Sequence, residues 1–172
     1  MTDAATFRTQ IGEAFVGDGA EAAHINTVLG ALGGPVETAW ASALAQPSAG
    51  HTPFVAVLQP GLAVKPLTLF VNKATIASDV HGTLTWGAAQ AGVAQGVADA
   101  VADETIAAAD VDDLLLIAAV WVNSAARDGD LVFANNATAV HDALVAGARR
   151  TPTVADVLAA RGDAWNPFRP RA

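Results

Sequence analysis

The sequence predicts an α/β (α+β) fold, a two-layer sandwich in which a mixed β-sheet carries helices packed on one face. Short apolar runs bounded by Gly, Pro and Asp alternate with stretches of helical periodicity, in the order β-β-α-β-β-α-β-α. The 172 residues contain no cysteine and no apolar run of membrane-spanning length, so one soluble, disulfide-free core is expected. Residues 1–150 are assigned to this domain, and residues 151–172 to a C-terminal helix and extended arm.

The first half of the chain is expected to form a hairpin, a short helix and a second pair of strands. Gly17-Asp18-Gly19 is a strong turn signal between two strand-like runs. Gly33-Gly34-Pro35 interrupts the chain, and apolar residues recur at helical spacing after it. Pro60-Gly61 then separates two further apolar runs. The expected strands are 12–16, 24–29, 52–59 and 67–75, and the expected helix covers 36–44.

The second half is expected to supply a long helix, a central strand and a final domain helix. These elements are residues 86–103, 114–122 and 135–148. Thr153 can cap a further short helix that ends at Gly162. Residues 163–172 carry aromatic and basic side chains on a chain that two prolines hold extended, so we expect an arm that docks on the same or a neighbouring subunit; the alternative is a disordered tail.

Composition restricts the partners and the compartment. A net charge of −8 repels nucleic acid and anionic membranes, so neither is an expected partner. With 52% apolar residues and few charges, the surface is too apolar for a monomer, and a homo-oligomer is expected. The first five residues lack the basic flank and apolar core of a signal peptide, which predicts a cytoplasmic protein.

The two lysines of the chain lie inside apolar runs and are candidates to bind an anion. Lys65 precedes a proline in a loop and is interpreted as a solvated side chain. Lys73 shares the strand phase of Leu69 and Val71, which makes it the candidate for a site.

Two further polar residues are candidates for chemistry. His24 follows the hairpin turn, and strand pairing could bring it to the same end of the sheet as Asp18, as an acid–base pair. The alternative is a structural strand histidine. Gln90 falls on the Val93–Val97 face of its helix, so its amide either finds partners in the core or a pocket, or reaches solvent at the helix start.

The remaining histidines are given no catalytic role. His51 is interpreted as a hydrogen-bond partner in the turn before a strand, and His81 and His141 are expected to be exposed. The chain also lacks a phosphate loop, a dinucleotide-binding glycine motif, a nucleophile elbow and a His-x-x-x-His zinc pair. The residues alone therefore lead to a cytoplasmic α/β domain with an anion-friendly pocket.

Several segments, in register from about Ile11 to about Ala148, closely resemble the formaldehyde-activating enzyme family. The matching segments are Gly17-Asp18-Gly19-Ala20-Glu21-Ala22-Ala23-His24-Ile25, Gly34-Pro35-Val36, Gly50-His51-Thr52-Pro53, the block from Val64-Lys65-Pro66 to Lys73-Ala74-Thr75-Ile76, Gly87-Ala88-Ala89-Gln90 and Val97-Ala98-Asp99-Ala100-Val101. Agreement at so many separate positions is more specific than any single motif.

The resemblance implies a pentameric ring enzyme that condenses formaldehyde with tetrahydromethanopterin to the methylene derivative and water, without a metal. The pterin would lie between neighbouring subunits. By matching positions, His24 would be the acid catalyst and Asp18 could hold it charged. The residues that would bind or shape the pterin site are Asp18, Lys73 and Gln90, with Thr68 and Trp86 as further candidates.

Three departures identify the chain as a divergent paralogue with a C-terminal extension. The family's tyrosine-rich stretch is replaced at residues 131–138, residues 77–86 are atypical, and the tail after Arg149 is expected to lie outside the resemblance. The alternative function is a non-catalytic protein that senses formaldehyde or its pterin adduct. Retention of His24 with Asp18 and Gln90 favours the enzyme.

Overall fold

The computed structural model describes residues 7–50 and 52–166. Its strands are β1 (Gln10–Val16), β2 (Ala23–Ala31), β3 (Pro53–Val55), β4 (Val57–Gln59), β5 (Leu62–Ala63), β6 (Leu67–Asn72) and β7 (Leu114–Trp121). Its helices are α1 (Pro35–Ala45), α2 (Asp79–Thr83), α3 (Gln90–Ala102), α4 (Gly129–Arg149) and α5 (Val154–Ala160), with a π-helical segment, η3 (Leu84–Ala89), and short 3-10 turns η2 (Gly19–Glu21) and η4 (Ala108–Asp110).

The main sheet is mixed, as expected, and its order is β1-β2-β7-β6-β3. β6 and β7 run parallel, whereas the other neighbouring pairs are antiparallel. β4 and β5 form a separate small hairpin. The predicted α+β class is therefore confirmed, and β7 is a central strand, as its continuous apolar run indicates.

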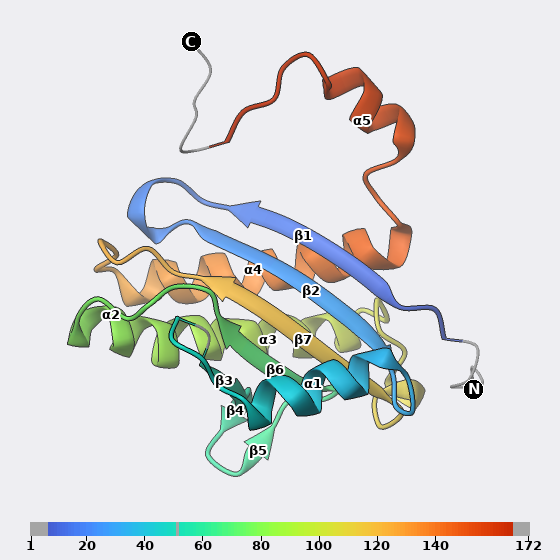
Figure 1. The fold of residues 1–172 in the computed structure, drawn as a ribbon, viewed down its shortest axis with the longest axis horizontal. Coiled ribbons are helices and arrows are strands. Elements are labelled where there is room, and N and C mark those ends of the chain that lie inside the picture. Colours follow the sequence, from blue (N-terminus) through green and yellow to red (C-terminus); the bar gives the residue numbers. More distant parts are fainter. Residues whose placement is uncertain (1–6, 51, 167–172) are drawn as a thin grey trace.

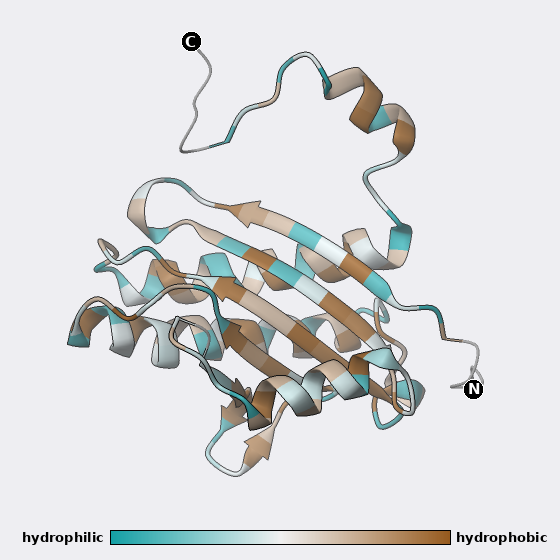
Figure 2. Cartoon of the chain, viewed as in Figure 1, coloured by the Kyte–Doolittle hydropathy of each residue, from teal (hydrophilic) through white to brown (hydrophobic). Residues whose placement is uncertain are grey.

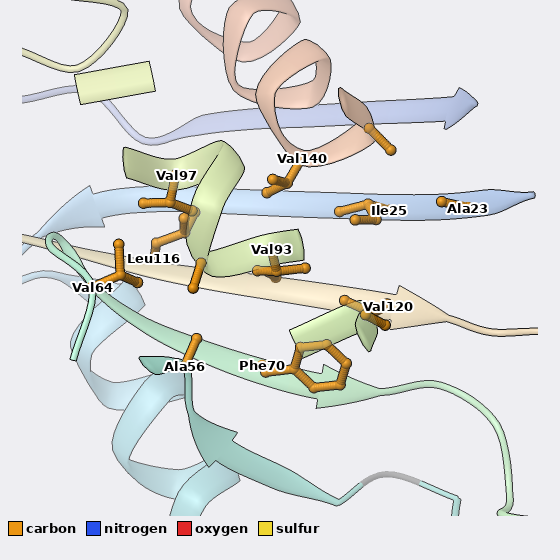
Figure 3. Close-up of a cluster of buried hydrophobic side chains, with 14 of the residues drawn as sticks. Ala23, Ile25, Ala56, Val64, Phe70, Val93, Val97, Leu116, Val120 and Val140 are labelled. Carbon is orange, nitrogen blue, oxygen red and sulfur yellow. The ribbon is translucent and has the colours of Figure 1, made fainter. Parts of the chain in front are cut away.

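Helices α3 and α4 cover one face of the main sheet (Figure 1). The core lies between these layers, where Ile25 of β2, Phe70 of β6 and Val93 of α3 are fully buried (Figure 3). The layers approach closely at glycines: a Cβ on Gly12 would lie 1.7 Å from the Ala143 carbonyl oxygen of α4. A larger residue at position 12 would therefore separate the helix from the sheet.

One helix departs from the expected arrangement on a single face. Val36 of α1 packs on Gly30, where an added Cβ would lie 2.4 Å from its Cγ2 atom. Gly30 points away from α3 and α4, because strand side chains alternate and Leu29 belongs to the core. α1 therefore crosses the other face at the Gly30 end of β2. The term open face refers to the part of this same sheet surface that lies near the start of β2, at the end opposite Gly30.

The strand expected over 52–59 is broken at Ala56. This residue is fully buried, its N–H donates to the Thr68 carbonyl at 2.9 Å, and its carbonyl accepts from Val64 N–H at 3.2 Å. The chain thus leaves the main sheet and turns into the β4–β5 hairpin. The strand expected over 67–75 ends earlier, because the Asn72 side chain accepts a bond from Ala74 N–H at 3.1 Å and forms a turn.

Two helices begin earlier than the sequence predicts. The helix expected from residue 86 is preceded by α2 and η3, which starts the helical run at Asp79 with Ser78 as its cap. α4 begins at Gly129 rather than 135, because the Asp128 side chain accepts bonds from the N–H groups of Asp130 and Leu131. The prediction that Thr153 caps the short C-terminal helix is confirmed.

The expectation that His81 is exposed is wrong. Its side chain is 1% exposed, Nδ1 accepts from Ala77 N–H at 3.1 Å, and Nε2 lies 3.0 Å from the Val122 carbonyl. His141 is partly exposed and pairs with Asp103 at 2.7 Å. His51 and residues 167–172 of the arm lie outside the described residues. Among the helices of the described part, none is long and apolar enough to cross a membrane.

Gln90 is buried and holds the break between β3 and β4 in place. Its Oε1 accepts from Val57 N–H at 2.6 Å, and its Nε2 donates to the Val57 carbonyl at 3.2 Å. Both backbone groups of one residue are therefore satisfied by one amide. Of the two alternatives for this side chain, partners in the protein interior are confirmed and free solvation is excluded.

We expect Gln90→Met to lower the free energy of unfolding by about 1–3 kcal/mol, because it leaves buried backbone groups without partners. Urea denaturation of the ligand-free protein measures this. Gln95→Met on the exposed side of the same helix is the control and should change stability by less than about 0.5 kcal/mol. Equal denaturation midpoints for the two variants would contradict a structural role for Gln90.

Candidate active site

Three neighbouring elements bring polar side chains together on the open face. Alternation along β2 directs His24 and Asn26 to this face, while Ala23 and Ile25 enter the core. Glu13 of β1 pairs with Asn26 in the strand register, and Lys73 follows the last residue of β6. The result is one mixed cluster of acid, base and amide on a sheet surface that α3 and α4 do not cover.

The closest contact in this cluster joins His24 to Glu13. His24 Nε2 lies 3.0 Å from Glu13 Oε1, and the two side chains are 38% and 58% exposed. This is a diagonal cross-strand pair, because the residue directly opposite His24 on β1 is Phe15. The Phe15 ring centroid lies 6.1 Å from that of the imidazole, and Trp121 faces His24 from β7 in the register. Aromatic residues therefore flank the imidazole on both neighbouring strands.

Lys73 is held at the other side of the cluster by two hydrogen bonds. Its Nζ donates to Asn26 Oδ1 at 2.7 Å, and its backbone N–H donates to the Val120 carbonyl at 2.8 Å. The ammonium group thus lies on the open face, in the phase that the sequence predicts from Leu69 and Val71. A neutral amide oxygen does not cancel the positive charge, so Lys73 can still attract an anionic ligand.

Burial and charge set the acidity of the two basic groups. Burial lowers the pKa of His24 below its ordinary value, and the nearby Lys73 charge lowers it further, whereas Glu13 raises it through charge and hydrogen bonding. The pKa of Lys73 is also lowered, chiefly by burial, and Glu13 opposes this shift. Glu13 is thus the group that favours the charged form of both. In its charged form a histidine with a lowered pKa is a stronger acid, which suits proton donation to a leaving group.

Asp18 does not make the contact with His24 that the hairpin suggests. It is exposed at the turn, where it precedes η2 without a side-chain capping bond. The carboxylate bound to His24 belongs to Glu13 instead. Lys65, interpreted as solvated, is an exposed loop residue that pairs with Asp112.

Three other expected site residues lie away from this cluster. Thr68 is fully buried on the helix side of β6, and its hydroxyl donates to the Pro66 carbonyl at 2.8 Å. It pairs with Leu116, five residues from the Trp121 position that faces His24, which is roughly 16 Å along the strand. Gln90 lies in the helix layer and bonds Val57. Among the expected residues, one protomer therefore brings together only His24 and Lys73.

Trp86 lines a cavity that is separate from the cluster on the open face. It is 49% exposed and lines a cavity of about 500 Å³ beside α2, together with Ile76, Asp79 and Gly82. An exposed indole at a hollow can stack on a flat ring. Its position in η3 places it in the helical layer rather than on the open face.

Sequence reasoning missed Glu13 and Asn26. Two signals could have found them. Asn26 is in phase with His24 along β2, and the pairing of β1 with β2 across the turn at Gly17-Asp18-Gly19 places Glu13 diagonally across from His24. Their residue types alone do not indicate a site, because single polar residues on a strand are usually solvated. Within the described residues, no group of three or more His, Asp or Glu side chains is placed to hold a metal ion.

The family model for the formaldehyde-activating enzyme (Fae) matches residues 11–169. The expectation that the tail after Arg149 lies outside the family is therefore wrong, because the match includes α5 and most of the arm. The division of the chain at residue 150 stays a prediction.

Curated relatives agree with the family match. A 5,6,7,8-tetrahydromethanopterin hydro-lyase of Methanosarcina barkeri is 42% identical over 161 residues, which cover 94% of this chain and 90% of the relative. Proteins named bifunctional enzyme Fae/Hps from Methanosphaerula palustris and Methanosphaera stadtmanae are 43% and 38% identical, and the chain spans 34% and 39% of their lengths. The chain belongs to the formaldehyde-activating enzyme family.

Proposed function

We propose that this protein condenses formaldehyde with tetrahydromethanopterin to methylene-tetrahydromethanopterin and water. The observation that carries the proposal is the match of nearly the whole chain to a tetrahydromethanopterin hydro-lyase, and it is supported by His24, paired with Glu13, and Lys73, bonded to Asn26, on one sheet face. The test is the rate of methylene formation by the purified protein above the spontaneous rate. Tetrahydrofolate, assayed in parallel, reports which pterin is preferred.

The chemistry requires proton transfer to a leaving oxygen. A ring nitrogen of the pterin adds to the formaldehyde carbon, and the hydroxyl group formed must be protonated before it departs as water. Loss of water leaves an iminium carbon, and the second nitrogen bonds to this carbon, releases its proton and so closes the five-membered ring. His24 as imidazolium supplies the proton, and its lowered pKa makes this cation a stronger acid. Phe15 and Trp121 occupy the positions opposite His24 on both neighbouring strands.

Lys73 provides the binding charge. It is half-buried, and its hydrogen bond to Asn26 fixes the position of its ammonium group. A positioned cation of this kind attracts the anionic part of the pterin. Asp18, at the turn beside the same hairpin, is proposed to line the entrance of this site.

We further propose a ring pentamer in the cytoplasm, with the pterin between subunits. Support comes from the separation of the site residues, because His24 and Lys73 lie on the open face while Gln90 and Trp86 lie in the helix layer. In such an assembly Trp86 contacts the pterin from the neighbouring subunit. Gln90 and the fully buried Thr68 act indirectly. Gln90 bonds the backbone of Val57, and the Thr68 carbonyl accepts from Ala56 N–H, so both position the chain between β3 and β5.

His24→Ala should lower the catalysed rate by ~10²-fold or more, because it removes the proton donor. The side chain is partly exposed, so its loss leaves no core cavity. Methylene formation is followed with formaldehyde and tetrahydromethanopterin, and circular dichroism checks the fold. An unchanged rate in a folded variant would reject His24 as the acid. Saturable pterin binding by the unmodified protein without acceleration would instead support the non-catalytic sensor.

Glu13→Gln should shift the pH profile of catalysis to lower pH. The imidazolium-dependent rate falls as pH rises through the pKa of His24, and Glu13 holds that pKa up against burial and Lys73. Removing the charge lowers the pKa, so the rate falls at a lower pH. NMR titration of the His24 ring, assigned with His24→Ala, measures the pKa without activity. The same His24 pKa in both proteins would mean that Glu13 does not maintain the charge.

Lys73→Met should raise the Kd for tetrahydromethanopterin, because it keeps the aliphatic stem and removes only the charge. Lys65→Met is the matched control, since Lys65 is an exposed loop lysine paired with Asp112. Titration at low salt compares the two variants with the unmodified protein. A Lys73→Met protein that binds as tightly as the control would remove Lys73 from the binding site.

A further inference from the structure

The Lys73 side chain reaches across the sheet to the strand that carries His24. Lys73 follows β6, which pairs with β7, and β7 in turn pairs with β2. The Nζ atom of Lys73 nevertheless lies 2.7 Å from Oδ1 of Asn26 on β2. His24 precedes Asn26 by two residues on the same face of that strand, and such neighbours are roughly 7 Å apart. The Lys73 amine and the His24 imidazole are therefore within reach of one small molecule.

The surroundings of Lys73 weaken its ammonium form. Its aliphatic stem crosses β7, which is apolar along its length (Figure 2). The side chain is half-buried, and burial lowers its pKa, whereas the charge of Glu13 opposes this shift. Its hydrogen-bond partner is the amide oxygen of Asn26, which carries no charge. A lysine is nucleophilic as the neutral amine, and desolvation is a usual way in which proteins make that form accessible.

The second lysine of the chain provides a contrast within the same molecule. Lys65 lies in a loop, its side chain is 53% exposed, and it forms an ion pair with Asp112. Solvent exposure alone would make Lys65 the more accessible amine of the two. A preference for Lys73 in a chemical reaction must therefore come from the groups that surround it.

An amine that takes up an aldehyde also needs an acid. The amine adds to the carbonyl carbon, and the hydroxymethylamine formed loses its hydroxyl group only after that oxygen is protonated. His24 supplies this proton as imidazolium, since Glu13 at 3.0 Å favours the charged form. Glu13 also favours a cation at Lys73 through its charge. The cluster thus combines a nucleophile, an acid and a counter-charge.

We propose that Lys73 is a covalent capture site for formaldehyde, with His24 as the acid that removes the oxygen. The amine nitrogen bonds to the formaldehyde carbon, and a proton moves from this nitrogen to the oxygen. The C–O bond then breaks as the oxygen takes the His24 proton and leaves as water, so that a Lys73 iminium cation remains. The iminium keeps the positive charge that attracts the pterin.

The captured carbon can pass to the pterin. The ring nitrogen attacks the iminium carbon and gives its proton to the lysine nitrogen, and the C–N bond to Lys73 breaks. The neutral amine is regenerated, and the pterin iminium is the same as after direct addition. This inference rests on formaldehyde being the substrate proposed above, but capture itself does not require the pterin.

Reductive trapping tests the capture without the pterin. Full-length protein is incubated at neutral pH with formaldehyde and excess sodium cyanoborohydride, which reduces an iminium cation to a methylamine. Tandem mass spectrometry locates the methyl groups on Lys73 and Lys65, the two lysines of the chain, in one sample. We expect the initial methylation rate of Lys73 to be several-fold higher than that of Lys65. Equal rates, or a higher rate at Lys65, would overturn the proposal.

Removal of the acid tests the role of His24 in the same reaction. His24→Ala should slow the methylation of Lys73 several-fold and leave that of Lys65 unchanged. His141→Ala is the matched control, because His141 lies on α4 and pairs with Asp103. Circular dichroism checks that both variants are folded. The same Lys73 rate in both variants would overturn the assignment of His24 as the acid.

The trapping result and the condensation result can be told apart. If Lys73 reacts no faster than Lys65 in a protein that accelerates methylene formation, the capture is rejected and direct addition of the pterin stands. If Lys73 is trapped preferentially in a protein without that acceleration, the capture is supported and belongs to a formaldehyde sensor.

Discussion

The strand register of β2 is the constraint on which both the core and the site depend. β2 is hydrogen-bonded to β1 on one side and to β7 on the other, so its pairing cannot shift without breaking two ladders. Ala23, Ile25 and Leu29 enter the core, and His24 and Asn26 point to the open face. A shift by one residue would bury His24 and expose Ile25. The stability of the core therefore holds the catalytic candidate in position.

The site itself is a balance among one acid and two bases. Burial and Lys73 both favour neutral His24, whereas Glu13 favours the imidazolium. Because these influences oppose one another, the protonation of His24 depends on each of its neighbours. Asn26 contributes by holding the ammonium group of Lys73 with a neutral oxygen, whereas Glu13 acts on Lys73 through its charge. The proposed acid and the proposed binding charge can then act on one ligand without neutralising each other.

The expected site residues are distributed over several surfaces of one protomer. One protomer leaves His24 on an uncovered sheet face, Trp86 at a hollow in the helix layer, and Leu158 on a helix without a partner in its own subunit. Each is an incomplete surface for an isolated chain. In the proposed oligomer, a contact between copies would complete such surfaces and bury part of the apolar area that 52% apolar residues provide.

Local sequence signals by themselves determined the hairpin turn at Gly17-Asp18-Gly19, the central strand of continuous apolar residues, the cap at Thr153 and the strand phase of Lys73. Each depends on neighbours along the chain, where turn chemistry and side-chain periodicity operate. The partner of His24, the burial of His81 and the use of the Gln90 amide were decided only by the tertiary structure. These depend on strand register and layer packing, which bring together residues far apart in sequence: Gln90 meets Val57 across 33 positions. Polar side chains take whatever partners that packing provides, because leaving them buried and unsatisfied is costly.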